Sequence, residues 1–91
     1  MIEFEWDSDK SLANITKHNV MFEKAIEIFL DENRLIIPDN RFDYGEQRFI
    51  SIGKVENRVH VVVYMEKVGN VIRIISARKT NKREIKHYDN R

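Results

Sequence analysis

The stretch VIRIISARKTNKREIKHY, residues 71–88, decides the fold of this 91-residue chain. Apolar and polar residues alternate through residues 71–78, as they do in a strand with one buried face. No glycine or proline separates this strand from the basic helical segment that follows, where Asn81 and Glu84 have the spacing of a capping box. Charged side chains therefore gather where strand passes into helix. This junction is either a phosphate-binding site or a solvated end of a small domain.

Two further strand patterns precede this one. Residues 46–54 and 58–66 also alternate with a period of two, and short turn segments separate the three runs. Strands with such short connections must pair antiparallel, because parallel pairing needs a long crossover. The sequence therefore predicts a meander of three strands. Apolar residues on both faces of residues 58–66 predict that this strand is central.

The first forty residues predict the elements that complete the fold. Residues 3–6 alternate polar and aromatic, which is typical of a short strand, and the Asp-Ser-Asp run after them can cap a helix ending near His18. Apolar residues at helical spacing predict a second helix at residues 22–29. A short strand over residues 34–37 ends at a proline, which cannot donate to a ladder.

These elements together predict an α+β fold. We expect a small antiparallel β-sheet, made of the three-stranded meander plus the N-terminal strand or strands, packed against two N-terminal helices. A short basic helix follows at the C-terminus. Only Ile85 and Tyr88 give that helix an apolar stripe, so it is expected to be among the least stable elements or to need a partner.

Length limits the number of domains, and the distribution of charge indicates the kind of partner. Ninety-one residues suit one domain, residues 1–91. Residues 1–57 carry 7 Lys and Arg against 12 Asp and Glu, and residues 58–91 carry 9 against 3, which gives net charges of −5 and +6. The C-terminal third is therefore a candidate surface for RNA, DNA or an acidic protein, unless the two charged parts only balance one another in the fold.

Several classes of protein are not expected. The chain has no cysteine, and no apolar run long enough for a signal sequence or a membrane span, so we expect a cytoplasmic protein without membrane association. It lacks a glycine-rich phosphate loop, an HExxH motif and a nucleophile elbow, and its three histidines are far apart in sequence. We therefore expect no metal and no cofactor.

The remaining residue types suit RNA cleavage without a metal. That reaction needs a base for the 2′-hydroxyl, cations for the phosphoryl oxygens and an acid for the leaving 5′-oxygen. The candidates are His18 or Glu46 as base, Arg48, Arg78 and Lys79 as phosphate clamp, and His18, Tyr88 or a lysine as acid. A solvated charged face explains the same residues, and composition alone favours it. Arg73, among isoleucines, either contacts phosphate or pairs with Glu46 or Glu66.

Five blocks of the sequence resemble the BrnT family of type II toxins. In chain order they are FEWDSDK, NITKHNVMFEKAIEIF, DYGEQRFISIGKVENR, VVVYME and RIISARKTNKREIKHY. Asn19 and Met21 stand where the family usually has a small capping residue and a glycine, so Met21 is expected to leave its helix without a side-chain cap. Glu46-Gln47 replaces the usual pair of acids.

The resemblance implies a RelE-like fold and a metal-independent endoribonuclease toxin that inhibits translation by cutting RNA. It also implies a hetero-oligomer with a BrnA-like ribbon-helix-helix antitoxin, through which alone operator DNA is bound. Lys17, His18, Glu46 and Arg48 can converge on the basic junction, where Ser76, Arg78 and Lys79 contact RNA. Arg83, Glu84 and His87 are left open between RNA contact, helix capping and antitoxin docking. The alternative is a non-catalytic basic binding module, or a degenerate toxin that acts as co-repressor.

Overall fold

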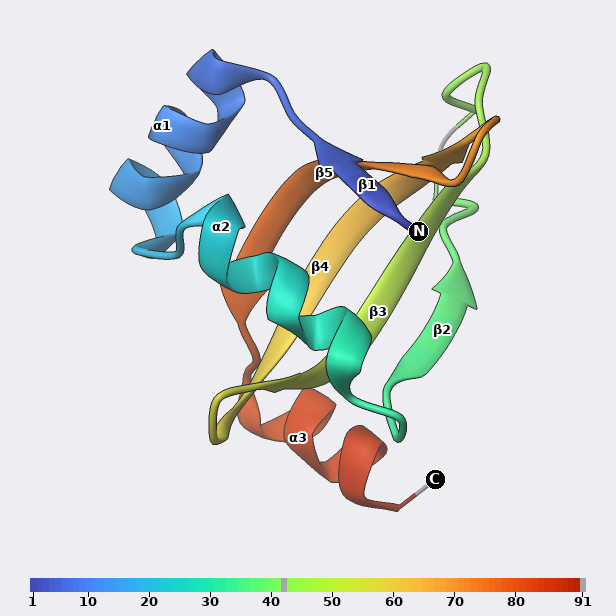
Figure 1. Ribbon diagram of the computed structural model, residues 1–91. Coiled ribbons are helices and arrows are strands. Elements are labelled where there is room, and N and C mark those ends of the chain that lie inside the picture. The colour runs from blue at the N-terminus through green and yellow to red at the C-terminus, as the bar shows by residue number, and fades with distance from the viewer. Residues whose placement is uncertain (42, 91) are drawn as a thin grey trace.

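The computed structural model describes residues 1–41 and 43–90. Five strands form one sheet, in the order β1 (Glu3–Glu5), β5 (Val71–Lys79), β4 (Arg58–Lys67), β3 (Arg48–Val55) and β2 (Leu35–Pro38). Three helices surround it, and the second continues into a 3₁₀ helix, η1 (Figure 1). The α+β class predicted from the sequence is confirmed.

The predicted meander forms the middle of the sheet. It consists of β3 (Arg48–Val55), β4 (Arg58–Lys67) and β5 (Val71–Lys79), with antiparallel pairing at both junctions. The central place of β4 is confirmed. The register shifts between Val63 and Tyr64, because Val63 pairs with Ser76 and Tyr64 pairs with Ile74. β5 therefore has one extra residue, Ile75, at this bulge.

The two outer strands differ in direction. β2 (Leu35–Pro38) pairs antiparallel with β3, but β1 (Glu3–Glu5) pairs parallel with β5. The prediction of an antiparallel sheet was therefore wrong, and the sheet is mixed. Periodicity specifies that a segment is a strand but not its direction, and the long chain between β1 and β5 leaves room for a parallel pairing.

The first helix, α1 (Ser8–His18), lies beside the β5 edge of the sheet (Figure 1). Asp7 caps it by accepting bonds from the backbone N–H groups of Asp9, at 2.8 Å, and Lys10, at 3.2 Å. The helix ends at Asn19, whose φ of 56° is left-handed. The predicted helix and its capping are confirmed.

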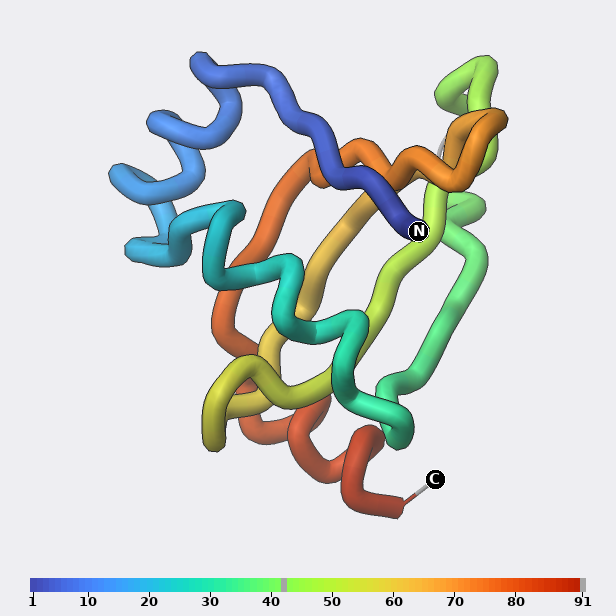
Figure 2. The backbone as a smooth tube through the Cα atoms, viewed as in Figure 1, coloured from blue at the N-terminus to red at the C-terminus, as the bar shows by residue number. Residues whose placement is uncertain are grey.

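The second helix crosses one face of the sheet. α2 (Phe22–Ala25) starts at Met21, which makes no side-chain cap, as predicted. It passes into η1 (Ile26–Leu30), and the two run as one coil in front of the strands (Figure 2). Their buried side chains pack on β4 and β5, in a main core formed by Phe22, Ala25 and Ile28 with Val62, Tyr64, Ile72, Ile74 and Ala77.

In the part of the chain that the structure describes, a helix covers one end of the opposite face of the sheet. There α3 (Lys82–Asp89) packs Tyr88 against Ile52, Val59 and Val61 in a second, smaller core. The predicted capping box is present: the Glu84 N–H donates to Asn81 Oδ1 at 2.9 Å, and the Asn81 N–H donates to Glu84 Oε1 at 3.0 Å. The rest of this face is left free to form a site. Within the described residues, no helix is long and apolar enough to cross a membrane.

Candidate active site

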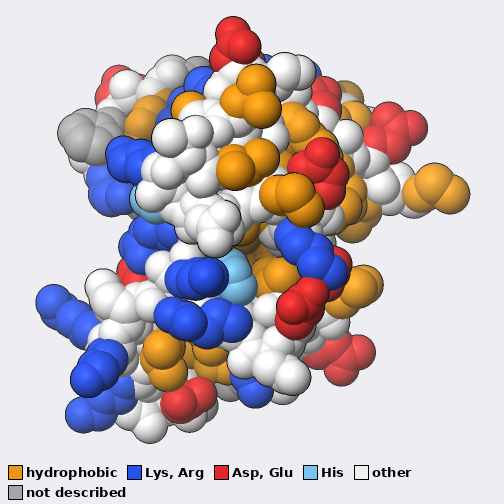
Figure 3. Space-filling model, turned by 90° about the vertical axis from the view of Figure 1, so that its left-hand side faces the viewer, with side chains coloured by type: hydrophobic (Ala, Val, Ile, Leu, Met, Phe, Trp, Pro, Cys, Tyr) orange, Lys and Arg blue, Asp and Glu red, His pale blue; other side chains and the backbone are white. Residues whose placement is uncertain are grey.

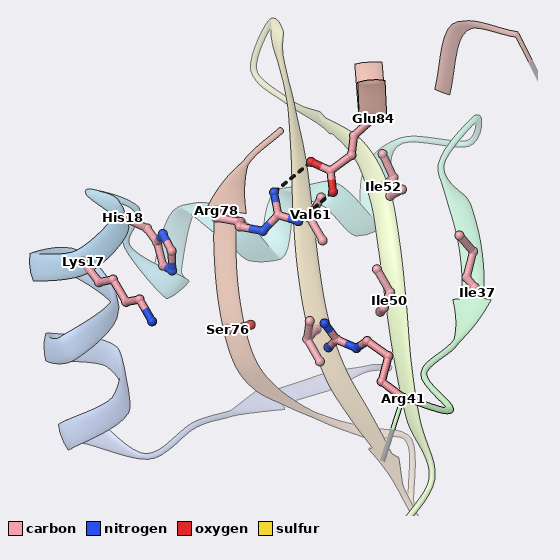
Figure 4. Close-up of a pocket in the computed structure, with 11 residues that line it drawn as sticks. Lys17, His18, Ile37, Arg41, Ile50, Ile52, Val61, Ser76, Arg78 and Glu84 are labelled. Carbon is pink, nitrogen blue, oxygen red and sulfur yellow. Dashed lines mark hydrogen bonds and ion pairs between the residues drawn. The ribbon is translucent and has the colours of Figure 1, made fainter. Parts of the chain in front are cut away.

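A cavity of about 490 Å³ lies on the sheet face that α2 and η1 leave uncovered. Side chains from α1, the loop after β2, β5 and α3 surround it (Figure 4). Its lining residues are Lys17, His18, Ile37, Arg41, Ile50, Ile52, Val61, Val63, Ser76, Arg78 and Glu84.

The floor of the cavity follows from strand alternation. Side chains two residues apart in a strand point to the same face, and paired residues in antiparallel strands share a face. Arg78 pairs with Val61, and Ser76 pairs with Val63. The floor is therefore apolar along β3 and β4, and it carries a hydroxyl and a guanidinium along β5.

One wall of the cavity is the C-terminal end of α1, which Asn14 fixes to β5. The Asn14 side chain is buried and donates to the carbonyls of Val20 and Ala77, both at 2.8 Å. Its Oδ1 accepts from the Ala77 N–H at 3.1 Å. Asn14 thus completes the β5 edge beyond β1, and it places Lys17 and His18 beside Arg78. The sequence analysis missed Asn14, although an asparagine inside a helix is a signal for such a bond.

His18 has the electrostatics of a proton acceptor. Burial lowers the pKa of its imidazole, and the nearby charges of Lys17 and Arg78 lower this pKa further. The ring is therefore mostly neutral at pH 7 and can accept a proton. In Figure 4, Lys17 and His18 point from α1 toward β5.

The opposite wall carries Arg41, which the sequence analysis also missed. Its guanidinium holds Asp39 through Nε–Oδ1 at 2.8 Å and Nη2–Oδ2 at 2.9 Å, and Tyr44 Oη donates to the same carboxylate at 3.2 Å. Arg41 lowers the pKa of Asp39 to about 2, so the pair is fully charged near neutrality. The signal in the sequence is an aspartate and an arginine two residues apart, directly after the strand-ending proline.

Arg78, at the centre of the cavity, is already paired. It donates to both carboxylate oxygens of Glu84, at 2.8 and 2.6 Å (Figure 4). The pairing raises the pKa of Arg78 and lowers that of Glu84. An incoming phosphate has to compete with Glu84 for this guanidinium. Lys17, in contrast, takes part in no ion pair within the described residues.

Glu46 and Arg48, two further predicted site residues, lie outside the cavity lining. They pair with each other at 2.9 Å, and the Arg48 guanidinium lies 3.9 Å from the centroid of the Tyr44 ring. Arg48 is on the same sheet face as Ile50, two residues along β3. The pair therefore lies next to the cavity and contacts its Arg41 wall through Tyr44.

Tyr88 and Arg73 lie outside the cavity lining and make structural contacts. Tyr88 is buried in the second core, and its hydroxyl donates to Asp31 Oδ2 at 2.6 Å. Arg73 is paired with Glu5 at 2.7 Å rather than with Glu46 or Glu66, because β1 lies beside β5.

The other predicted residues lie around the two ends of the cavity. Lys79 follows Arg78 in β5, so its side chain points to the other face, where it lines a second cavity. Arg83 and His87 line a shallow hollow on α3, which shares Ile52 and Glu84 with the main cavity. Lys17, His18, Ser76 and Arg78 are therefore the predicted residues that the structure brings together. Across residues 1–41 and 43–90 there is no group of three or more His, Cys, Asp or Glu side chains that could hold a metal ion.

The comparisons with known proteins agree with this architecture. The model of the family described as "Ribonuclease toxin, BrnT, of type II toxin-antitoxin system" matches residues 6–84. The chain belongs to the BrnT family of ribonuclease toxins. The family resemblance in the sequence is thereby confirmed, and membership implies an antitoxin partner and an RNA target for this BrnT-family chain.

A solved structure supports the fold of this BrnT-family chain. The crystal structure of the Brucella abortus ribonuclease toxin BrnT matches with a TM-score of 0.73 and 23% sequence identity. The match covers 90% of this chain and 100% of that one. A comparison with curated proteins gives no match.

Proposed function

We propose that the chain is a metal-independent endoribonuclease toxin that cuts RNA in the main cavity and thereby inhibits translation. The observation that carries this proposal is the convergence of Lys17, His18, Arg41 and Arg78 on one concave sheet face. Cationic side chains fixed on separate elements suit the recognition and stabilisation of a phosphodiester.

The neutral imidazole of His18 is the proposed general base. It takes the proton of the ribose 2′-hydroxyl, and the 2′-oxygen attacks the adjacent phosphorus. The bond from phosphorus to the 5′-oxygen then breaks, and the products are a 2′,3′-cyclic phosphate and a free 5′-hydroxyl. We assign the proton on that hydroxyl to Lys17, which neighbours His18 at the end of α1.

Arg78 and Arg41 are the proposed partners of the phosphoryl oxygens. Both guanidiniums are oriented before RNA binds, Arg78 by Glu84 and Arg41 by Asp39. Such preorganised charge stabilises the transition state without reorganisation during the reaction. Ser76 contributes a hydroxyl on the cavity floor that can bond the ribose or the phosphate.

The proposal includes the partner that the family resemblance implies. A BrnA-like ribbon-helix-helix antitoxin would neutralise the toxin in a hetero-oligomer, and operator DNA would be bound only through that antitoxin. A protein that covers the main cavity would exclude RNA from the same cations. The relationship to RelE-like ribonucleases belongs to this proposal as well.

RNA cleavage by the purified protein in excess EDTA tests the proposed reaction. We expect cleavage to continue in chelator, and we expect His18→Ala to reduce its rate by about a hundredfold or more. The matched control is Lys10→Ala on the same helix, which is exposed and outside the cavity lining. Loss of wild-type cleavage in EDTA would contradict a metal-independent mechanism.

The second candidate function is a non-catalytic binding module, or a degenerate toxin that acts as a co-repressor. The ion pair of Arg78 with Glu84 favours it, since this cation is already neutralised. Expression of the chain alone in a bacterium separates the two functions. A ribonuclease toxin arrests growth and its His18→Ala variant does not, whereas a binding module permits growth in both cases.

A further inference from the structure

A second cavity of about 380 Å³ lies directly behind the first, around the end of β5. It is lined by Asn19, Val20, Met21, Lys24, Val55, Glu56, Arg58, His60 and Lys79. The two linings have no described residue in common, but three pairs of chain neighbours are divided between them. His18, Val61 and Arg78 line the first cavity, and their neighbours Asn19, His60 and Lys79 line the second.

The backbone explains this back-to-back arrangement. Arg78 and Lys79 are consecutive in β5, so their side chains point to opposite faces of the sheet. Asn19 is the left-handed residue that ends α1, and it turns the chain away from the first cavity. The backbone of residues 18–19 and 78–79 therefore separates the two cavities, and a polymer bound in the first has the second beside it.

The second cavity combines an apolar floor with a cationic rim. Val20 and Val55 are buried on the floor, and Met21 is 48% exposed. Lys79 and Arg58 are exposed and form no ion pair within the described residues, whereas Lys24 is held by Glu56 at 2.7 Å and by Glu27 at 3.0 Å. Figure 3 shows hydrophobic side chains and a histidine in a hollow, with Lys and Arg side chains gathered along one side.

His60 adds a hydrogen-bond acceptor to this cavity. Its Nδ1 lies 2.7 Å from the carbonyl oxygen of Arg58, which can only accept, so Nδ1 carries the proton. Nε2 is then the unprotonated nitrogen. Burial lowers the pKa of the ring, which keeps it neutral near pH 7. An apolar floor, a neutral acceptor and two free cations on the rim match a nucleobase attached to a phosphate backbone.

We propose that the second cavity binds the base of an RNA nucleotide next to the scissile phosphate, with Lys79 and Arg58 on the backbone. The inference rests on the proposed function, because the polymer that enters both cavities is RNA. An acidic peptide would also meet the two cations. It would not account for the place of this cavity directly behind the proposed catalytic one, so we infer that RNA is the occupant.

Binding of 2′-O-methyl RNA tests the second subsite without cleavage, because a methylated 2′-oxygen cannot attack. Fluorescence anisotropy compares a dinucleotide, which fills the first cavity alone, with a pentanucleotide that can reach both. We expect Met21→Glu to lower the affinity for the pentanucleotide by about tenfold, because it places a carboxylate beside the base. The dinucleotide should bind this variant as it binds the wild type.

The salt dependence of pentanucleotide binding gives a second readout. Replacing one phosphate-contacting lysine lowers the slope of log affinity against log salt concentration by about one. We expect this for Lys79→Gln and no change for Lys10→Gln, an exposed lysine outside both cavities. Met21 and Lys79 are both exposed, and melting temperatures verify that the variants fold.

Several outcomes would overturn the second subsite. Wild-type pentanucleotide affinity in Met21→Glu together with an unchanged salt slope in Lys79→Gln would do so. Weakened antitoxin binding in these variants, with RNA binding intact, would assign the cavity to a protein contact instead. Failure of the proposed function is distinguishable: absent cleavage with length-dependent binding intact would contradict the catalytic assignment and support the subsite.

Discussion

Arg78 at the end of β5 and Glu84 in the first turn of α3 form a bidentate ion pair, with Nη1–Oε1 at 2.8 Å and Nη2–Oε2 at 2.6 Å. The same Glu84 carboxylate accepts from the Asn81 N–H in the capping box. The Glu84 side chain therefore caps the start of α3 and also pairs with Arg78 in the proposed active site. RNA binding and the position of α3 are coupled through it.

Glu84→Gln separates these two tasks, because glutamine can close the capping box but carries no charge. We expect RNA to bind about two- to fivefold more tightly, since a partly exposed pair of this kind contributes about 0.5–1 kcal/mol. Affinity for 2′-O-methyl RNA measures the effect. Glu66→Gln, an exposed acid on β4, is the control. Weaker RNA binding by Glu84→Gln would show that Arg78 needs this carboxylate for its orientation.

The ionisation of His18 predicts the pH dependence of cleavage. Its folded-state pKa lies below the ordinary 6.5, so the base form persists to lower pH than in a free histidine. The kcat/KM for RNA should therefore rise with pH through an inflection below 6.5 and then level off. Lys17→Gln removes one of the neighbouring charges, and NMR titration of the imidazole should then show a higher pKa. An inflection above pH 6.5 in the wild type, together with an imidazole pKa that stays the same in Lys17→Gln, would contradict His18 as the base.

Asn14 is predicted to position the α1 wall rather than to touch RNA. Asn14→Ala leaves the Val20 carbonyl and both backbone groups of Ala77 without their partner, which should lower the free energy of unfolding by about 2–4 kcal/mol. Thr16→Ala, exposed on the same helix, should change it by less than about 0.5 kcal/mol. Below its melting temperature, Asn14→Ala should lose kcat, because His18 is misplaced. Full activity in the folded variant would refute this role.

Features that depend on neighbouring residues could be predicted from the sequence, whereas contacts between residues far apart in the chain could not. The spacing of Asn81 and Glu84 predicted a capping box because both partners belong to one helical turn. The hydrogen bond from Asn14 to Ala77 joins residues 63 positions apart, and the periodic pattern of apolar residues does not predict such a contact. For the same reason the direction of β1 was predicted wrongly. At the site, strand alternation places Ser76 and Arg78 together, whereas Arg41 depends on how a loop folds back.

Asp39 is predicted to hold Arg41 ready for phosphate. Arg41 lies in a loop, whereas Arg78 is held on β5, so Arg41 depends more on its carboxylate partner for orientation. Asp39→Asn removes the charge that fixes the Arg41 guanidinium, so KM for RNA should rise more than kcat falls. The lowered pKa of Asp39 means that its ionised form stabilises the fold above pH 3.8, and this contribution is lost as pH falls toward about 2. The stability difference between wild type and Asp39→Asn should therefore shrink between pH 3.8 and 2 in acid-unfolding curves. Asp43→Asn, an exposed acid in the same loop, is the control for both measurements.

Tyr88 was predicted from the sequence as a candidate proton donor, but its contacts favour an anchoring role. The residue is 5% exposed, and its hydroxyl donates to Asp31 Oδ2, which also accepts from the Lys54 N–H at 2.8 Å. Tyr88→Phe keeps the ring in the second core and removes only the hydroxyl. We expect a loss of about 1 kcal/mol in the free energy of unfolding and faster amide exchange in α3, with unchanged cleavage by the folded protein.

The same variant tests whether Tyr88 takes part in catalysis. A general acid contributes about 10²–10⁴-fold to the rate, so its removal would be unmistakable in single-turnover cleavage. Lys17→Gln is the matched comparison, since Lys17 lines the cavity and has the proposed role of proton donor. If Tyr88→Phe remained folded and lost cleavage while Lys17→Gln retained it, the proton would have to come from α3. Because the hydroxyl is bonded to Asp31 on the buried side of that helix, we expect the opposite result.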